Sequence, residues 1–152
     1  MRVESNQIRL AATDLSNHLA CRHLTLLDLS VALGQRSAPE WRSPDLVVIQ
    51  ERGKRHEAAY LAHLAGQKNL LVANLEAIKD EQTLVAETQR LMEQGTDVIA
   101  QGALREGQWF GRPDVLRRIA THSLHWNWSY EVVDTKLARE TKAATILQLS
   151  LY

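Results

Sequence analysis

The sequence lacks the features that mark secreted or membrane-spanning proteins. Its 152 residues include a single cysteine, Cys21, which cannot form a disulfide within the chain. This favours a reducing compartment such as the cytoplasm. No apolar run approaches the roughly 20 residues that a membrane-spanning helix needs, and residues 1–10 lack the apolar core of a signal peptide. We therefore expect a cytoplasmic protein with no membrane partner.

The sequence also lacks a net charge, because its 18 Lys and Arg residues are balanced by 18 Asp and Glu residues. Domains that bind nucleic acids are often basic, so the balance argues against a large positive surface but is compatible with a local basic groove. The apolar fraction of 45% is that of a globular protein. The length fits one domain that can bury a core of its own.

The spacing of apolar residues predicts a mixture of helices and strands. Helices are expected at 13–33, 44–65, 80–94 and 138–152, and Gly66 and Gly95 would end the second and third of them. Strands are expected at 70–74, 97–104, 108–119 and 128–137, the second and third forming a hairpin through Glu106-Gly107. This order predicts an α/β or α+β domain with a central mixed sheet flanked by helices.

Asp134 and Lys136 are two residues apart in the last predicted strand, so both side chains would project from one face of the sheet. A salt bridge at the strand end explains such a pair as well as a catalytic role does. The run Tyr130-Glu131-Val132-Val133 predicts a buried strand, and charged residues follow at its carboxyl end. Sites in open sheets gather at such ends, which favours the functional interpretation.

Asp114 follows Gly111-Arg112-Pro113, and a proline predicts a bulge or an edge at this point of the strand. An aspartate in a turn is the simpler explanation of a lone Pro-Asp pair. If the hairpin pairs with the next strand, however, Asp114 lies beside Asp134. Two close carboxylates repel each other unless a divalent cation such as Mg²⁺ lies between them.

Helical spacing groups two further sets of residues. Gly53, His56 and Tyr60 would share one face of the long helix, and a glycine there, about 1 kcal/mol less favourable than alanine, indicates a close approach by the hairpin or by a nucleic-acid backbone. Glu57 lies about 100° further round, where it would face solvent or bind a metal through water. On the last helix, Lys142, Thr145, Gln148 and Tyr152 form a polar stripe. A surface histidine and a solvated helix face are the ordinary explanations.

The motifs Gly53-Lys54-Arg55-His56, Gly111-Arg112-Pro113-Asp114, Asp134-Thr135-Lys136 and Gln148…Tyr152 occur in a fixed order. In this order the chain resembles the RecB-type branch of the PD-(D/E)xK nucleases, with the glycine one residue closer to the histidine than in the commonest form. The segment 130–139 is similar to predicted bacterial RecB-like nucleases, which are related to CRISPR-associated exonucleases and often fused to a helicase or an RNase-H-like domain. The resemblance covers nearly the whole chain.

The resemblance implies a restriction-endonuclease-like core in a single domain, with a helical part at about 1–66 and a catalytic core at about 67–152. His56, Asp114, Asp134 and the backbone carbonyl of Thr135 would bind Mg²⁺ or Mn²⁺. Lys136 would orient the attacking water or stabilise developing charge. Gln148 would position the lysine or the scissile strand, with Tyr152 and Lys142 beside it at the substrate. The implied activity is hydrolysis of DNA ends or single strands by an exonuclease in DNA repair.

Cys21 has a counterpart in iron–sulfur members of this branch, which add three more cysteines after the last motif. A [4Fe–4S] cluster needs four thiolates, so it could form only in a longer parent protein. Because the last motif ends on Tyr152, we expect a domain truncated at its carboxyl end, and the fragment alone could be inactive.

Two other hypotheses about the function stay open at this point. One is a catalytically inactive DNA-binding or scaffold module with a nuclease-like fold, which the neutral net charge favours modestly. The other is an unrelated interaction domain, in which Trp41, Trp109, Trp126 and Trp128 would line a surface. Such residues more often pack in a core or a hairpin.

Overall fold

The structure is a computed structural model that describes residues 1–40, 44–135 and 140–152. Lys136 and Trp41, both named above, lie outside the described residues. The chain forms two compact units, each discontinuous in sequence. One unit comprises residues 44–104 and 112–138, and the other comprises residues 1–43, 105–111 and 139–152. No described helix is both long and apolar enough to cross a membrane.

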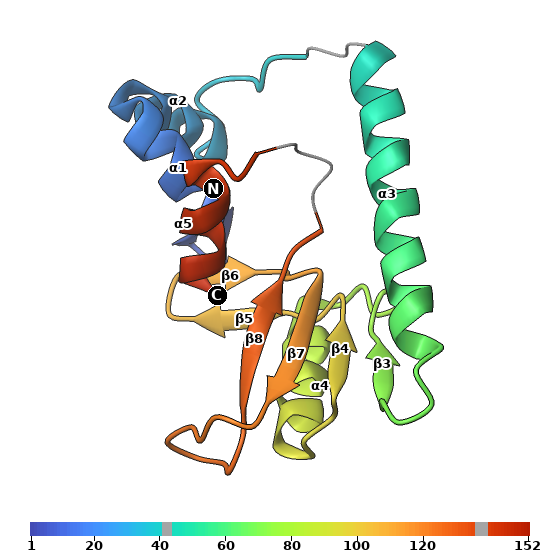
Figure 1. Ribbon diagram of the computed structural model, residues 1–152. Coiled ribbons are helices and arrows are strands. Elements are labelled where there is room, and N and C mark those ends of the chain that lie inside the picture. Colours follow the sequence, from blue (N-terminus) through green and yellow to red (C-terminus); the bar gives the residue numbers. More distant parts are fainter. Residues whose placement is uncertain (41–43, 136–139) are drawn as a thin grey trace. The chain divides into compact units, whose positions relative to one another are not determined.

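The first unit, which we call the sheet unit, is built on a four-stranded sheet (Figure 1). Its strands, in spatial order, are β3 (Val72–Asn74), β4 (Val98–Ala100), β7 (Val115–Ile119) and β8 (Ser129–Val133). β3 and β4 are parallel, whereas β7 is antiparallel to both of its neighbours. The predicted class, a mixed sheet with helices, is therefore confirmed.

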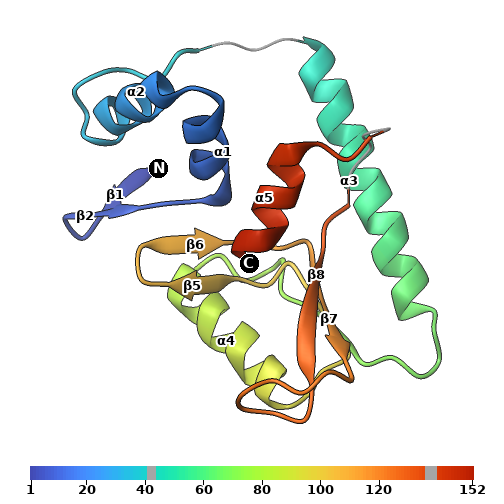
Figure 2. The ribbon, with the colours of Figure 1, turned by 60° about the vertical axis from the view of Figure 1, so that its left-hand side comes forward.

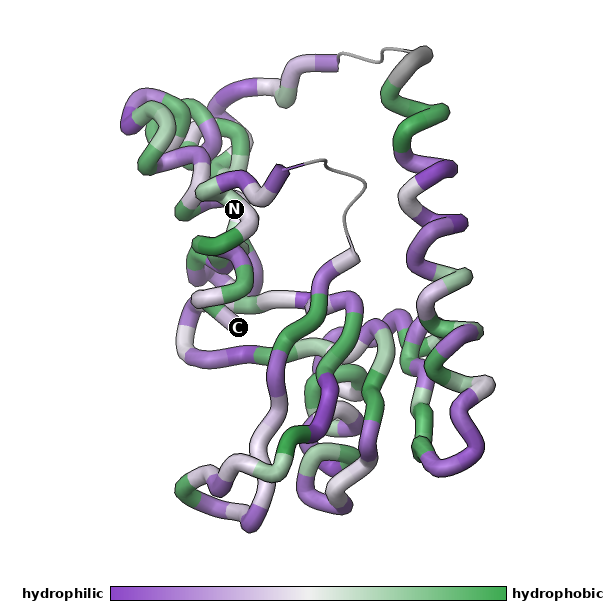
Figure 3. The backbone as a smooth tube through the Cα atoms, in the orientation of Figure 1, coloured by the Kyte–Doolittle hydropathy of each residue, from purple (hydrophilic) through white to green (hydrophobic). Residues whose placement is uncertain are grey.

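One face of this sheet packs against the long helix α3 (Pro44–Ala65). Leu64, 5% exposed, forms a buried cluster with Val98 and Val115, and Tyr60 and Val133 pack at its margin. Figure 3 shows the apolar strands beside the apolar carboxyl-terminal end of this helix. The predicted bounds of 44–65 are confirmed, and the helix joins the sheet through its last turns.

Helix α4 (Glu81–Glu93) lies on the opposite face. Side chains alternate along β8, so Tyr130 points away from the face of Val133, and its hydroxyl donates to the carbonyl of Thr96 just after α4 (2.7 Å). Asp80 caps the helix by accepting from the Thr83 amide at 2.8 Å, and Gly95, with φ 70°, follows its end. The prediction of 80–94 is confirmed to within a residue at each end.

The second unit, which we call the terminal unit, holds the chain termini and the tip of a hairpin. Its elements are β1 (Arg2–Glu4), β2 (Gln7–Arg9), α1 (Ala12–Ala20), α2 (Arg22–Ala32), β6 (Trp109–Gly111) and α5 (Ala143–Leu151), together with the end of β5 (Leu104–Glu106). β1 pairs with β2, and a bridge between Leu10 and Trp109 connects this ribbon to β6 (Figure 2). The β1–β2 ribbon was not predicted.

The predicted single helix at 13–33 was wrong. It is broken at Cys21, whose extended backbone (φ −159°, ψ 111°) ends α1 and begins α2. No glycine or proline marks this break in the sequence, so the continuous apolar pattern concealed it. The last helix begins at Ala143, later than the predicted residue 138.

The predicted long hairpin is interrupted and forms two separate pairings. β4 pairs with β7, and β5 pairs with β6 in a sheet of two strands. The interruption falls at Gln101, whose φ is 55°, and on the other side at Pro113, which is fully buried between β6 and β7. The disruption expected at Pro113 is confirmed, because proline cannot donate to a strand ladder.

Candidate functional site

Polar side chains gather at one edge of the four-stranded sheet. β3, β4 and β8 end at this edge and β7 begins there, because β7 alone runs in the opposite direction. Val115 pairs with Ala100 on one side and with Val133 on the other. The same register places Asp114 opposite Asp134, one residue beyond the last pair. The prediction that strand pairing brings these two aspartates together is confirmed.

Asp114 is held in place by the chain that follows β8. Its Oδ2 atom accepts from the backbone amide of Thr135 at 2.8 Å and from the Thr135 hydroxyl at 3.0 Å. Its backbone carbonyl accepts from the Gln101 amide at 2.9 Å. Two hydrogen bonds to one oxygen fix the carboxylate on the partly exposed edge and leave Oδ1 for another partner.

Asp134 lies just past the end of β8 rather than inside a strand, since β8 ends at Val133. The strand predicted at 128–137 therefore ends before Asp134, and the expected sharing of one strand face with Lys136 stays a prediction, because Lys136 lies outside the described residues. Asp134 is half-buried beside the Asp114–Thr135 contact. Its position depends on where β8 ends, which strand alternation does not predict.

Glu57 of α3 faces the same edge. Gln101 donates a hydrogen bond to its carboxylate from the end of β4. Burial raises the pKa of Glu57 above its ordinary value of 4.5, and the negative charges of Asp114, Glu76 and Asp134 raise this pKa further, against the opposing effect of Gln101. These shifts show that carboxylates from α3, from the end of β3 and from both sides of the β7–β8 pair share one electrostatic environment.

His56 is exposed, on the neighbouring face of α3. The face that turns toward the sheet carries half-buried or buried residues at Gly53, Glu57, Tyr60, Leu61 and Leu64. The expected grouping of Gly53, His56 and Tyr60 on one face is therefore wrong for His56, because Glu57 shares the packed face with Gly53 and Tyr60. The periodicity of residues 57, 60, 61 and 64 would have identified Glu57, since apolar residues at such spacing mark the packed face.

The predicted close approach at Gly53 is not seen. A Cβ atom placed there would meet no heavy atom of the described residues within 4 Å. The hairpin does not account for this glycine, and an approach by a nucleic-acid backbone stays a prediction.

Asp114, Asp134 and Glu57 bring carboxylate oxygens to this edge. Carboxylate oxygen is the type of donor that Mg²⁺ and Mn²⁺ prefer. No group of three or more His, Cys, Asp or Glu side chains in the described part of the chain lies in an arrangement that could hold a metal ion. The described geometry thus provides a carboxylate pair with a third carboxylate nearby, rather than a closed set of ligands.

Gln148, Tyr152 and Lys142 belong to the terminal unit. Gln148 donates to the hydroxyl of Tyr152 at 3.3 Å, one helical turn away, so these two residues share a face of α5 as expected. The Tyr152 ring lies directly against Gly111, where an added Cβ would overlap it. Lys142 is exposed at the N-cap of α5. Contact between the glycine of one predicted motif and the tyrosine of another was not foreseen.

Cys21 is exposed between α1 and α2. It is the only cysteine of the sequence, so the chain alone cannot supply the four thiolates of a [4Fe–4S] cluster. Its expected role in a longer parent protein stays a prediction.

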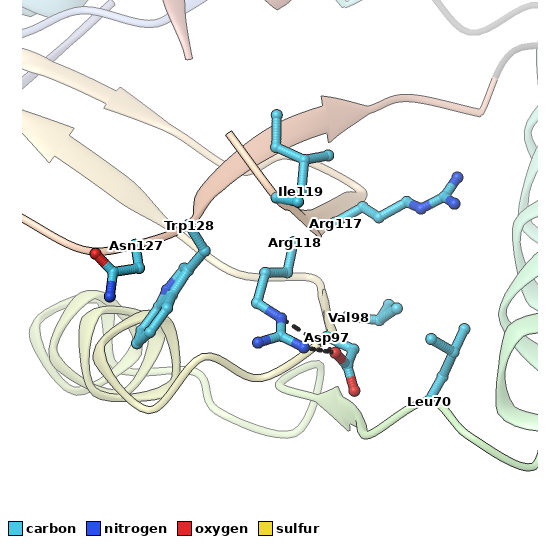
Figure 4. A pocket seen from close by; sticks show the side chains of 9 residues that line it. Leu70, Asp97, Val98, Arg117, Arg118, Ile119, Asn127 and Trp128 are labelled. Carbon is cyan, nitrogen blue, oxygen red and sulfur yellow. Dashed lines mark hydrogen bonds and ion pairs between the residues drawn. The ribbon is translucent and has the colours of Figure 1, made fainter. Parts of the chain in front are cut away.

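A pocket of about 320 Å³ lies at the other end of the sheet, away from Asp114 and Asp134. Figure 4 shows Trp128 and Asn127 on one side of it, Leu70 on the other, and the Arg118–Asp97 ion pair between them. Both Asp97 oxygens are engaged, one by Arg118 at 2.5 Å and the other by the Leu71 amide at 2.9 Å. These contacts hold the pKa of Asp97 below its usual range. The ion pair and the Leu71 contact together connect the start of β4 to β7 and to the segment before β3.

Two of the four tryptophans pack together beside this pocket. Trp126 and Trp128 are stacked with ring centroids 6.3 Å apart, and the indole of Trp128 donates to the Met92 carbonyl at 3.0 Å. This contact fastens the β7–β8 loop to the end of α4. It supports packing, rather than an open aromatic surface, as the role of Trp128.

Comparisons with models of protein families, with curated proteins and with solved structures give no match to this chain. The resemblance to RecB-type nucleases therefore rests on the four sequence motifs.

Proposed function

We propose that the chain carries the centre of a divalent-metal-dependent nuclease that hydrolyses DNA, acting on ends or single strands. The observation that carries this proposal is the placement of Asp114 opposite Asp134 at the sheet edge, where Thr135 fixes Asp114. Glu57 faces the same edge, and its pKa is raised by burial first and by the charges of both aspartates in addition. Lys136 follows two residues after Asp134 in the sequence. An edge with three carboxylates, followed in the sequence by a lysine, suits phosphodiester chemistry.

In this proposal Asp114 and Asp134 hold Mg²⁺ or Mn²⁺, with the Thr135 carbonyl as a further ligand. Such a cation, when bound, lowers the pKa of a water ligand and offsets charge on the phosphate. Thr135 keeps Asp114 oriented through its amide and its hydroxyl. Glu57 serves as a third carboxylate in place of His56, whose predicted role as a ligand is retained only as an alternative. Lys136 stabilises developing negative charge.

Cleavage of labelled single-stranded and duplex DNA, with Mg²⁺, with Mn²⁺ and with a chelator, tests the proposal. We expect cation-dependent cleavage that falls by about 100-fold or more in Asp114→Ala and in Lys136→Ala, as for the loss of a group that stabilises the transition state. Lys68→Ala and Glu93→Gln, both at exposed positions, are matched controls that should cleave normally. Circular dichroism checks that each variant is folded.

Two results would count against the proposal. Cleavage that survives in Asp114→Ala would place the activity elsewhere. DNA binding in the chelator without cleavage under any condition, also in a longer form of the protein, would favour the inactive binding module.

A further inference from the structure

A second pocket, of about 190 Å³, lies in the terminal unit, and none of the carboxylates of the sheet edge lines it. It is lined by Met1, Arg2, Arg9, Leu10, Ala11 and Phe110. Most of these residues are apolar, and two are arginines. The volume is below the range of pockets for drug-sized ligands, so any ligand must be small.

Arg9 is the unusual residue of this pocket. It is only 8% exposed, and its Nη2 atom forms an ion pair with Glu4. Its Nη1 atom is buried and has no hydrogen-bond partner among the described residues. A buried donor left unsatisfied costs about 1–3 kcal/mol, and more when the group is charged. A guanidinium in this state favours an anion that accepts from Nη1.

The surrounding charges also favour an anion. Arg2 and Arg9 are direct partners across the β1–β2 ribbon, and like charges at such positions repel each other. Arg2 lies over the Phe110 ring, 5.6 Å from its centroid. Glu4, at 41% exposure, is the carboxylate paired with Arg9.

Asp14 at the start of α1 does not complete the site. One of its oxygens accepts from the Ala11 amide at 2.7 Å, and the other from the Met1 nitrogen at 2.5 Å. Both oxygens are therefore engaged, and neither is left for Arg9.

We propose that this pocket binds a small monocarboxylate with a short apolar chain. The carboxylate accepts from Arg9 Nη1, and the chain lies against Leu10, Ala11 and Phe110. A planar guanidinium matches a carboxylate better than a spherical anion. The site is independent of the proposed nuclease centre, since it uses none of the same residues.

Titration of the isotope-labelled protein with hexanoate, followed by NMR of the backbone amides and the Arg9 Nε–H, tests this proposal. Saturable shifts are expected at Arg9, Leu10 and Phe110. Hexan-1-ol, which has the chain without the charge, should bind at least about tenfold more weakly, the loss expected when one charge-assisted hydrogen bond is missing. Inorganic phosphate, which has charge without the chain, should also bind at least about tenfold more weakly, because it buries no apolar surface in the pocket.

Two variants move the affinity in opposite directions. Arg9→Gln should weaken hexanoate binding at least about tenfold. Glu4→Gln, at a more exposed position, should strengthen it by releasing Nη2 for a bidentate contact. Absence of saturable shifts, equal binding of hexanoate and hexan-1-ol, preference for phosphate, or an unchanged affinity in Glu4→Gln would each overturn the proposal.

Discussion

Asp114 and Glu57 reach the same sheet edge by different routes, and of the two only Asp114 was in the set of site residues predicted from the motifs. Pro113 predicts a break before Asp114, and the pairing of neighbouring strands then places this aspartate opposite Asp134. The position of Glu57 depends on the rotation of α3 about its axis, and the packing of Leu64 against Val98 and Val115 fixes this rotation. A motif centred on His56 does not contain that information, so sequence reasoning left Glu57 undecided.

Glu57 makes stability depend on pH in a defined direction. Because its pKa is raised in the folded state above 4.5, the folded protein holds a proton that the unfolded chain has lost in the window above that pH. This contribution to stability is therefore greatest at acid pH and declines as pH rises through the folded-state pKa. The substituted side chain of the Glu57→Gln variant cannot ionise, so we expect the free energy of unfolding of this variant to increase relative to that of wild type as pH rises.

Urea unfolding from about pH 4 to about pH 8 measures this difference directly. Glu51→Gln, at an exposed position of the same helix, is the matched control for removing a carboxylate from α3. A constant difference for Glu57→Gln over the whole range would show that Glu57 is not in the shared environment of the carboxylates.

Helix α4 was predictable because its ends carry local signals, an aspartate cap and a following glycine. The break at Cys21 and the interrupted hairpin have weaker signals or none. Gln101 adopts a positive φ, which a glutamine in the sequence does not predict. Cys21 lies within a continuous apolar pattern, which predicts no break. Elements with capping residues were thus located well, and interruptions set by tertiary packing were not.

Thr88 connects α4 to the segment that follows β4, and it was not singled out in the sequence. It is 1% exposed, and its hydroxyl donates to the Leu84 carbonyl at 2.8 Å while accepting from the Ala103 amide at 2.9 Å. Thr88→Val keeps the shape but leaves the buried Ala103 amide without this acceptor. We expect a loss of about 1–3 kcal/mol in the free energy of unfolding.

Hydrogen exchange at the Ala103 amide distinguishes this cause from a general loosening. Exchange should be faster in Thr88→Val than in Thr88→Ser, which keeps the hydroxyl and loses only a methyl group. Equal exchange rates in the two variants would mean that the hydroxyl does not protect this amide.

Across the whole molecule, the mixed class of the fold was predictable and its division was not. A boundary near residue 66 would separate α3 from the sheet, yet Leu64 packs in the same cluster as Val98 and Val115. The strands of the hairpin also divide between the two units. Contacts between residues far apart in sequence decide such divisions, and apolar periodicity reports only local structure.

The central claim is that the sheet edge at Asp114 and Asp134 binds a divalent cation. Paramagnetic broadening by substoichiometric Mn²⁺, observed by NMR, tests it most directly. The amides of Thr135, Gln101 and Glu57 should broaden first, those of residues 123–127 at the other end of the sheet should stay sharp, and Asp114→Asn should abolish the selectivity. Broadening that is uniform, that centres on another part of the chain, or that persists in Asp114→Asn would contradict the claim.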